Sequence, residues 1–520
     1  MSDSTITFAV LAAVVVVFVW DRVPVAIVAI GVALTLWATG VLGYDQAFEG
    51  FGDPTVIFIA SLFVVSEGLE ASGVTAWAGQ QLIARAGESR TRLIVLTMLL
   101  VAALTMLISV NGSVAALVPV AVVAAVRLGR SPSQLLIPVA FGAHAGSLLA
   151  LTGTPVNVIV SDAAGDAGVG SFGFFSFALV GVPLVIGTIA IVVVAGERLL
   201  PHRSPRTIAP DFSEHARTLA RQYALEHRED SLLTRAKGIA EVVIPPRSEA
   251  IGSSVFPGMV TSSGDFVVLA IQRGGEELEP EETVLAVGDT LLLHGTWDAL
   301  DQGLDDSVLV VDSPELVRRQ AVPLGAGAKR ALAALTGMVV LLATGAVPAA
   351  VAGLLAACAI VLMGVLSVEQ AYRGISWTTV ILIGGMISLS TAMVESGAAE
   401  TLADDLVSVV GDAGPHALLL GLFVLTATLG QLISNLATAL IVIPVAVSAA
   451  ADLDVSAKPV LMAVTVAAAA AFLTPVATPA NLMVMGPGGY RFGDYWKLGG
   501  LLLLLFGIVA VLLVPVFWGF

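Results

Sequence analysis

Charged residues are scarce in this sequence: Asp, Glu, Lys and Arg together make up 12% of it, whereas hydrophobic residues make up 57%. Soluble domains contain about 25% charged residues, so most of this chain is not an ordinary soluble domain. The only cysteine, Cys358, lies in an apolar run, which excludes a disulfide framework and a thiolate metal site. The net charge of −16 gives no indication of a nucleic-acid partner, and none is expected.

Long apolar runs are what the sequence has instead, and its mean hydropathy is +0.95. The runs lie toward both ends of the chain, on either side of a polar stretch from about Pro201 to Lys329. Several reach the roughly 20 helical residues that cross ~30 Å of hydrocarbon. The first, Ile6 to Val19, ends in Trp20-Asp21-Arg22 without a small-residue cleavage pattern, so we expect a retained span rather than a signal peptide. The sequence predicts an all-α polytopic membrane protein with a small α+β soluble insert.

The two ends of the chain match one another at a constant offset, which we call the repeat offset. Asn111 matches Asn435 (435 − 111 = 324), and further matches at this offset are Thr154 with Thr478, Asn157 with Asn481, "GVL" at Gly40 with Gly364 and "TVI" at Thr55 with Thr379. Agreement over such a length is typical of an internal repeat. We therefore expect membrane repeat 1 in residues 1–200, a cytoplasmic linker and small domain in 201–327 with its core at 240–306, and membrane repeat 2 in 328–520.

Each half is predicted to contain five transmembrane helices and one re-entrant hairpin. In the first half the spans are expected at 5–20, 24–43, 54–72, 134–161 and 174–197, and the hairpin at 93–127. The hairpin segment of ~35 residues is too long for one crossing, while each arm beside its polar tip at Ser109–Val114 is short for a full crossing. Irregular backbone at this depth must be buried in protein or line a wet cavity. Because five crossings is an odd number, the halves face opposite ways as inverted repeats.

The basic residues predict the orientation of the protein in the cell membrane. The loops 44–53, 162–173 and 396–415 contain no Lys or Arg, and alternating the loops places every basic loop residue except Lys458 on the other side. Positively charged loops stay in the cytoplasm. The soluble insert is therefore expected to be cytoplasmic and both termini to be outside.

The fifth span of each half is interrupted at its centre. Gly153-Thr154-Pro155-Val156-Asn157 in the first half corresponds to Ala477-Thr478-Pro479-Ala480-Asn481 in the second. Proline removes a backbone donor and clashes with the preceding turn, so both helices should unwind here and expose carbonyls and amides. With the oxygens of the hairpin tips, these breaks predict two polar cups near the membrane midplane. Neutral oxygens there suit Na⁺, whereas helix N-termini and hydroxyls suit an anion.

The paired tips and Thr-Pro-x-Asn breaks, together with "LTPVATPANLMVMGPGGYRFGDY" at Leu473–Tyr495, resemble the divalent anion/sodium symporter family of the ion transporter superfamily. In that family, tip and break form two sodium sites and a clamp around sulfate or a di- or tricarboxylate. The resemblance implies these substrate contacts: Asn111, Ser113, Thr154, Pro155, Asn157, Ser434, Asn435, Thr438, Thr478, Pro479 and Asn481. It implies these Na⁺ contacts: Asn111, Gly112, Gly153, Asn157, Ser434, Asn435, Ala477 and Asn481. The sequence departs from the family at two positions. Leu436 stands where the family often has Thr, and Val110 stands where the family has a polar residue.

The insert alternates apolar and polar residues over 240–256, 265–280 and 283–300, which predicts short strands with turns at Gly274-Gly275 and Gly288-Asp289. It resembles the C-terminal subdomain of the regulators of potassium conductance, called TrkA-C. No G-x-G-x-x-G follows a strand, so a nucleotide-binding companion is not expected. Residues 211–238 are charged and predicted to be helical. The insert is expected to be regulatory, with a small-molecule effector, or else to be a dimerising cytoplasmic cap. The protein is expected to be a homodimer.

One ionisable residue is expected near mid-depth. His144 lies about ten residues into the fifth span at a rise of ~1.5 Å each, and its repeat counterpart is Ala468. It would act in transport or make a hydrogen-bonded packing contact. The sequence predicts sodium-coupled symport of a small divalent anion, without an organic cofactor. The alternative is a sodium/proton antiporter or another proton-linked carrier of the same superfamily. A channel is not expected, because the sequence contains no selectivity-filter motif. An enzyme is not expected, because no nucleophile and base can be assembled from these motifs.

Overall fold

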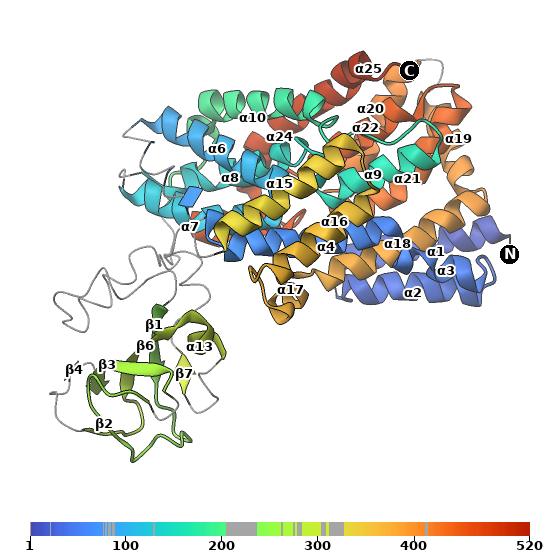
Figure 1. Ribbon diagram of the computed structural model, residues 1–520. Helices are drawn as coiled ribbons and strands as arrows, with labels where there is room; N and C mark the ends of the chain where they lie inside the picture. Colours follow the sequence, from blue (N-terminus) through green and yellow to red (C-terminus); the bar gives the residue numbers. More distant parts are fainter. Residues whose placement is uncertain are drawn as a thin grey trace. The chain divides into compact units, whose positions relative to one another are not determined.

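The computed structural model describes residues 2–20, 22–75, 77–78, 81, 85, 89–127, 130–203, 237–261, 264–273, 276–277, 283–302, 308–310, 327–410 and 414–520. The chain forms two compact units. One is helical and comprises Met1–Gly68, Gln81–Ala209 and Arg330–Phe520; the other comprises Leu69–Gln80 and Pro210–Lys329 and contains a small sheet (Figure 1). The domain boundaries expected from the sequence are close to these limits but stay predictions.

The helices of the first half are α1 (Asp3–Trp20), α2 (Val25–Ala38), α3 (Tyr44–Glu49), α4 (Pro54–Ala71), α6 (Arg90–Leu107), α7 (Val110–Arg127), α8 (Leu136–Gly146), α9 (Pro155–Asp166) and α10 (Ala178–Leu199). Those of the second half are α15 (Ala328–Thr344), α16 (Ala349–Leu362), α17 (Val368–Gly374), α18 (Trp377–Glu395), α19 (Ala398–Val410), α20 (Pro415–Leu429), α21 (Asn435–Asp452), α22 (Ala457–Ala468), α23 (Pro479–Gly488), α24 (Tyr495–Ile508) and α25 (Val514–Phe517). Within the described part of the chain, seven helical stretches are long and apolar enough to cross a membrane. The protein is thus a mostly helical, multi-pass membrane protein.

The helix boundaries follow the sequence repeat. At the repeat offset, both ends of α16 coincide with those of α2, the end of α18 coincides with that of α4, and the start of α23 coincides with that of α9. Equivalent positions therefore start and stop helices in both halves. That the halves face opposite ways remains a prediction.

Three expectations about the membrane halves were wrong in detail. Residues 44–53 and 396–415, expected as loops, contain α3, a 3₁₀ turn at Gly50–Gly52 and α19. α19 buries Ala399 and Ala403 while its acidic residues are exposed, so a one-sided helix was mistaken for a polar loop. One hairpin arm is also longer than expected: α6 has 18 residues. At 1.5 Å per residue this arm is about 27 Å long, close to the thickness of the hydrocarbon core.

The sheet of the second unit has the strand order β4-β3-β6-β1-β7. Its strands are β1 (Lys237–Val243), β3 (Phe266–Arg273), β4 (Glu276–Glu277), β6 (Thr290–Thr296) and β7 (Leu309–Val310), with α13 (Trp297–Gln302) after β6 and a separate pair of β2 (Ser254–Val255) and β5 (Thr283–Val284). β6 pairs antiparallel with both β1 and β3. Alternate residues such as Val242, Val268 and Leu293 form one core with Trp297, as the period-two pattern predicts.

An ion pair with a buried carboxylate fixes one edge of this core. Arg273 donates through Nε to Asp289 Oδ1 and through Nη2 to Oδ2, both at 2.7 Å, and these hydrogen bonds lower the pKa of Asp289 below its ordinary value. Gly288 makes the expected turn with φ of +85°. The expected turn at Gly274-Gly275 lies outside the described residues, as does 211–236 of the expected helix, whereas the last two residues of that helix, 237 and 238, belong to β1.

Candidate functional site

The first break is held open by the side chain of one asparagine. α8 ends at Gly146 and α9 begins at Pro155, with Thr154 extended (φ −154°, ψ 148°) as the residue that precedes the helix. Asn157, in the first turn of α9, donates through Nδ2 to the carbonyl oxygens of Ser147 and Ala150, at 2.8 Å each. Proline at the first helical position loses no hydrogen bond, because that N–H has no partner in a helix. The interruption expected at Pro155 is therefore confirmed.

The second break has the same internal hydrogen bonds at the equivalent positions of the repeat. Asn481 Nδ2 donates to the carbonyl oxygens of Ala471, at 2.7 Å, and Thr474, at 3.1 Å. Pro479 is the first residue of α23, and the Thr478 hydroxyl accepts from the backbone N–H of Asn481 at 3.3 Å. We call this pair of Nδ2 bonds the asparagine clamp of each break.

Glycines let backbone approach both breaks very closely. A Cβ on Gly153 would lie 2.2 Å from the carbonyl oxygen of Ser147, within the first break itself. A Cβ on Gly181 of α10 would lie 2.0 Å from the carbonyl oxygen of Leu148, and one on Gly499 of α24 would lie 2.2 Å from that of Phe472. The last long helix of each half therefore packs directly against the backbone of that half's break.

The first hairpin tip lies between α6 and α7. Ser113 is buried, and its hydroxyl lies 2.5 Å from that of Thr105 in the other arm. The backbone N–H of Gly112 donates to Ser109 Oγ at 3.1 Å. Asn111, by contrast, has an exposed side chain. Of the residues expected to bind at this tip, the hydroxyl of Ser113 already has a partner, whereas the side chain of Asn111 is exposed.

The second hairpin tip leaves buried oxygens without partners. Ser434 caps α21, its hydroxyl accepting from the N–H of Ala437 at 3.2 Å. Asn435 Oδ1 and Thr438 Oγ1 are buried and have no hydrogen-bond partner among the described residues. They are three positions apart on α21 and so share one face of that helix. This face carries neutral oxygen atoms of the kind that a cation can use.

Hydrogen bonds join tip and break within each half. In the first half, Thr152 Oγ1 donates to the carbonyl oxygen of Met106 at 2.9 Å. In the second, Gln431 donates to the carbonyl oxygen of Ala470 at 3.1 Å and accepts from the N–H of Leu473 at 3.0 Å. Sequence reasoning missed Gln431; a glutamine inside an apolar segment beside the tip was the available signal. The arms also reach across the halves, since α7 contacts α23 and α21 contacts α9.

His144 joins the two halves at the second break. It is 2% exposed, and its Nε2 lies 3.2 Å from Thr478 Oγ1 and 3.3 Å from Asn481 Oδ1. The tautomer decides whether Nε2 donates to the amide oxygen or accepts from the hydroxyl. The histidine on α8 of one half thus makes a hydrogen-bonded contact with two expected binding residues of the other half.

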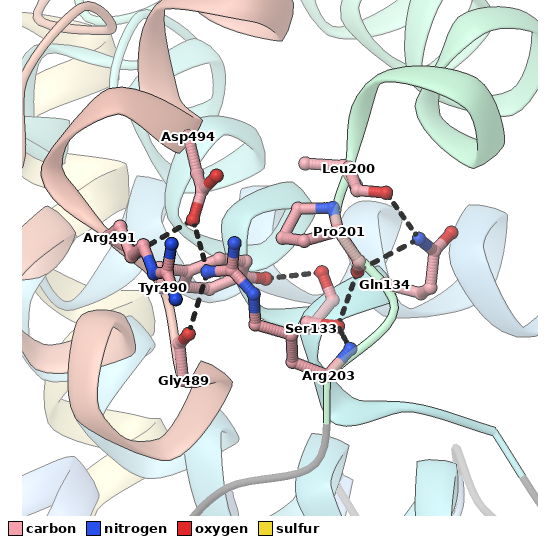
Figure 2. A network of polar contacts seen from close by, with 9 residues as sticks. All are labelled: Ser133, Gln134, Leu200, Pro201, Arg203, Gly489, Tyr490, Arg491 and Asp494. Atoms are coloured by element: carbon pink, nitrogen blue, oxygen red, sulfur yellow. Dashed lines mark hydrogen bonds and ion pairs between the residues drawn. The ribbon is translucent and has the colours of Figure 1, made fainter.

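A second polar network, which sequence reasoning missed, surrounds Arg203 just before the insert (Figure 2). Arg203 Nη1 donates to Asp494 Oδ2 at 2.6 Å and to the carbonyl oxygen of Gly489 at 3.0 Å. The backbone N–H of Arg203 donates to Ser133 Oγ at 2.9 Å, and Tyr490 OH donates to the carbonyl oxygen of Ser133 at 2.5 Å. The network ties the end of the first half to the connection between α23 and α24. The "GGYRFGDY" part of the long motif was the signal for it.

The multi-pass helical fold and the two polar breaks define a membrane transporter. The chain belongs to the citrate transporter family CitMHS, whose model matches residues 15–467 and again 339–520. It is 31% identical to the uncharacterised transporter YfbS of Escherichia coli (strain K12), over 98% of each chain. It is 26% identical to the probable sodium/sulfate cotransporter 3 of Chlamydomonas reinhardtii, over 54% of this chain and 32% of that protein. The family and these relatives are transporters rather than enzymes.

The fold is similar to a solved structure, that of the YdaH transporter of Alcanivorax borkumensis. The TM-score is 0.53 with 15% identity, and the match covers 97% of this chain and 98% of that one. At this identity the likeness concerns the fold alone.

Proposed function

We propose that the protein is a secondary active transporter that carries a small divalent anion, sulfate or a di- or tricarboxylate, together with Na⁺. The family name supports a carboxylate, and the name of the Chlamydomonas relative supports sulfate and sodium. The expected substrate contacts at the tips and breaks, and the expected Na⁺ contacts other than Asn481, are part of this proposal.

The observation that carries the proposal is the set of buried neutral oxygens at the tips and breaks. Asn435 Oδ1, Thr438 Oγ1 and Asn157 Oδ1 are buried and without a partner in the part of the chain that the structure describes. A buried acceptor without a donor is unfavourable, and Na⁺ binds to such neutral oxygens. Asn157 lies in the first turn of α9, and α9 contacts α21. The N-termini of α9 and α23 attract an anion.

The charge balance favours more than one Na⁺ for each anion. An unpaired dianion in a low-dielectric site is costly, and one Na⁺ from each cup would neutralise it. A third Na⁺ would make transport electrogenic. In this proposal the halves are inverted repeats that alternately open the shared site, with the insert in the cytoplasm and both termini outside. The insert has a regulatory or dimerising role, because the proposed binding residues all belong to the membrane halves.

Uptake into proteoliposomes tests the proposal. Labelled sulfate, succinate, citrate and phosphate are each offered with and without an inward Na⁺ gradient, and we expect one class of divalent anion to accumulate only with the gradient. Asn435→Ala and Asn111→Ala should each abolish most uptake while the protein remains monodisperse in detergent. Near-normal uptake in both variants would contradict the proposed site. Accumulation driven by a pH gradient alone, and abolished by His144→Gln, would establish the proton-linked alternative instead.

A further inference from the structure

We infer that the two breaks contribute unequally to Na⁺ binding: the Asn157 carboxamide oxygen is a Na⁺ ligand, whereas its counterpart on Asn481 is not, because His144 holds it. The inference rests on the proposed sodium coupling. It separates two residues that the repeat makes equivalent in sequence.

The side-chain nitrogen atoms of the two asparagines make equivalent hydrogen bonds. Asn157 Nδ2 donates to Ser147 and Ala150, and Asn481 Nδ2 donates to the residues at the same offset, Ala471 and Thr474. Both side chains are 0% exposed. Because each clamp fixes the orientation of its amide group, each Oδ1 must point away from the loop that its own nitrogen holds.

The oxygen atoms of the two amides have different surroundings. Asn481 Oδ1 lies 3.3 Å from His144 Nε2, whereas Asn157 Oδ1 is buried without a hydrogen-bond partner among the residues described. The repeat explains the difference. α8 carries His144 and contacts α23, while α22 contacts α9 and has Ala468 at the position that corresponds to His144. A methyl group cannot donate, so the Asn157 oxygen lacks the partner that its counterpart has.

The threonine before each helix differs in the same sense. The Thr478 hydroxyl caps α23 and contacts His144, at 3.2 Å, whereas the Thr154 side chain makes no capping bond to α9. The first break thus presents an amide oxygen and a hydroxyl from one helical turn, both of which can coordinate Na⁺. The N-terminus of α9 also favours negative charge, so Na⁺ at this position is held best together with the anionic substrate.

Alanine at each asparagine provides a matched pair of variants. Asn157→Ala and Asn481→Ala each remove one asparagine clamp, so any loss of folding should be similar in both. Only Asn157→Ala removes the unpartnered oxygen. We expect the Na⁺ concentration for half-maximal effect to rise about tenfold or more in Asn157→Ala, as for loss of a contact to a charged group. In Asn481→Ala the Na⁺ concentration for half-maximal effect should change less than about threefold, because this variant affects Na⁺ binding only indirectly.

The measurement uses the full chain in detergent. The rise in unfolding temperature with NaCl, compared with choline chloride at equal ionic strength, reports Na⁺ binding without transport; anion uptake against Na⁺ concentration is the second readout. Ala468→His leaves both clamps intact and gives Asn157 the partner that Asn481 has. It should weaken Na⁺ binding in the same way, whereas His144→Ala should not.

The outcomes separate the inference from the proposed function. If wild type is neither stabilised by Na⁺ nor dependent on it for uptake, sodium coupling fails, and the inference fails with it. If wild type binds Na⁺ and Asn157→Ala binds it equally well, the inference fails while sodium coupling stands. Equal losses in the two alanine variants would likewise overturn it. If the alanine variants do not fold, Ala468→His decides: unchanged Na⁺ affinity overturns the inference, and weakened affinity supports it.

Discussion

Replacing Arg203 by alanine should destabilise the helical unit, because this side chain joins its two halves (Figure 2). Arg203 donates to Asp494 and Gly489, and the exposed fractions of the Arg203 and Asp494 side chains are 33% and 10%. Both hydrogen bonds involve the charged guanidinium, and a hydrogen bond to a charged group contributes about 1.5–3 kcal/mol. Screening at the partly exposed arginine lowers this figure. Asp494 keeps its bond from the N–H of Arg491. We expect a loss of about 2–3 kcal/mol in the free energy of unfolding.

The assay is denaturant unfolding in detergent of wild type, Arg203→Ala, Asp494→Asn and the double variant. The double-mutant cycle should give a coupling energy of about 1–2 kcal/mol between the two side chains. Arg198→Ala is the control, because it removes the same side chain from an exposed position at the end of α10; it should change the free energy by less than about 0.5 kcal/mol. A coupling energy near zero, or equal effects of Arg203→Ala and Arg198→Ala, would refute the reasoning.

Three further predictions concern the first break and the insert. Gly153→Ala should destabilise the protein by about 1–3 kcal/mol, because its Cβ would lie 2.2 Å from the Ser147 carbonyl oxygen; the reverse change at the matching position, Ala477→Gly, should cost less in the same denaturant-unfolding assay. Arg273 lowers the pKa of Asp289 in the folded state. This pair therefore stabilises the folded insert above about pH 4, and the stabilisation is lost as pH falls through the pKa that Asp289 has in the folded state. The protection of the β3 and β6 amides against hydrogen exchange, corrected for the pH dependence of intrinsic exchange, should therefore fall in acid, and already at neutral pH in Asp289→Asn; protection that is independent of both changes would contradict this. Deleting the core of the insert, residues 240–306, should leave uptake measurable but altered in rate, and complete loss of uptake in a well-folded deletion would argue that the insert belongs to the transport machinery.

The positions of the breaks could be predicted because proline constrains the backbone locally. Pro155 and Pro479 cannot lie inside a regular helix without loss of a hydrogen bond, and each begins a new helix in the structure. The repeat offset could be predicted because it needs only residue identities. The strands of the insert follow from period-two alternation, which reports directly on burial. Each of these features depends on information within a short window or on exact self-similarity.

The contacts between distant residues could not be predicted. Nothing in the sequence indicates that His144 meets Asn481, and the "GGYRFGDY" motif marks Asp494 without identifying Arg203 as its partner, because these pairs depend on how the two halves pack. The repeat was misleading here, since it treats Asn157 and Asn481 as equivalent. α19 was missed for a different reason: its acidic residues were counted as loop charge, whereas they occupy the exposed face of a helix.

The glycine contacts behind the breaks affect how the protein can move. Gly181 lets α10 touch the backbone at Leu148, and Gly499 lets α24 touch the backbone at Phe472, with no side chain between them. These contacts join backbone to backbone, so they contain no side chain that could change its rotamer and let one part slide past the other. Each break and the helix behind it should therefore travel as one rigid body during the transport cycle. Spin labels on α9 and α10 would then keep a constant separation in every state of the carrier, while labels placed on α10 and α18 would change theirs.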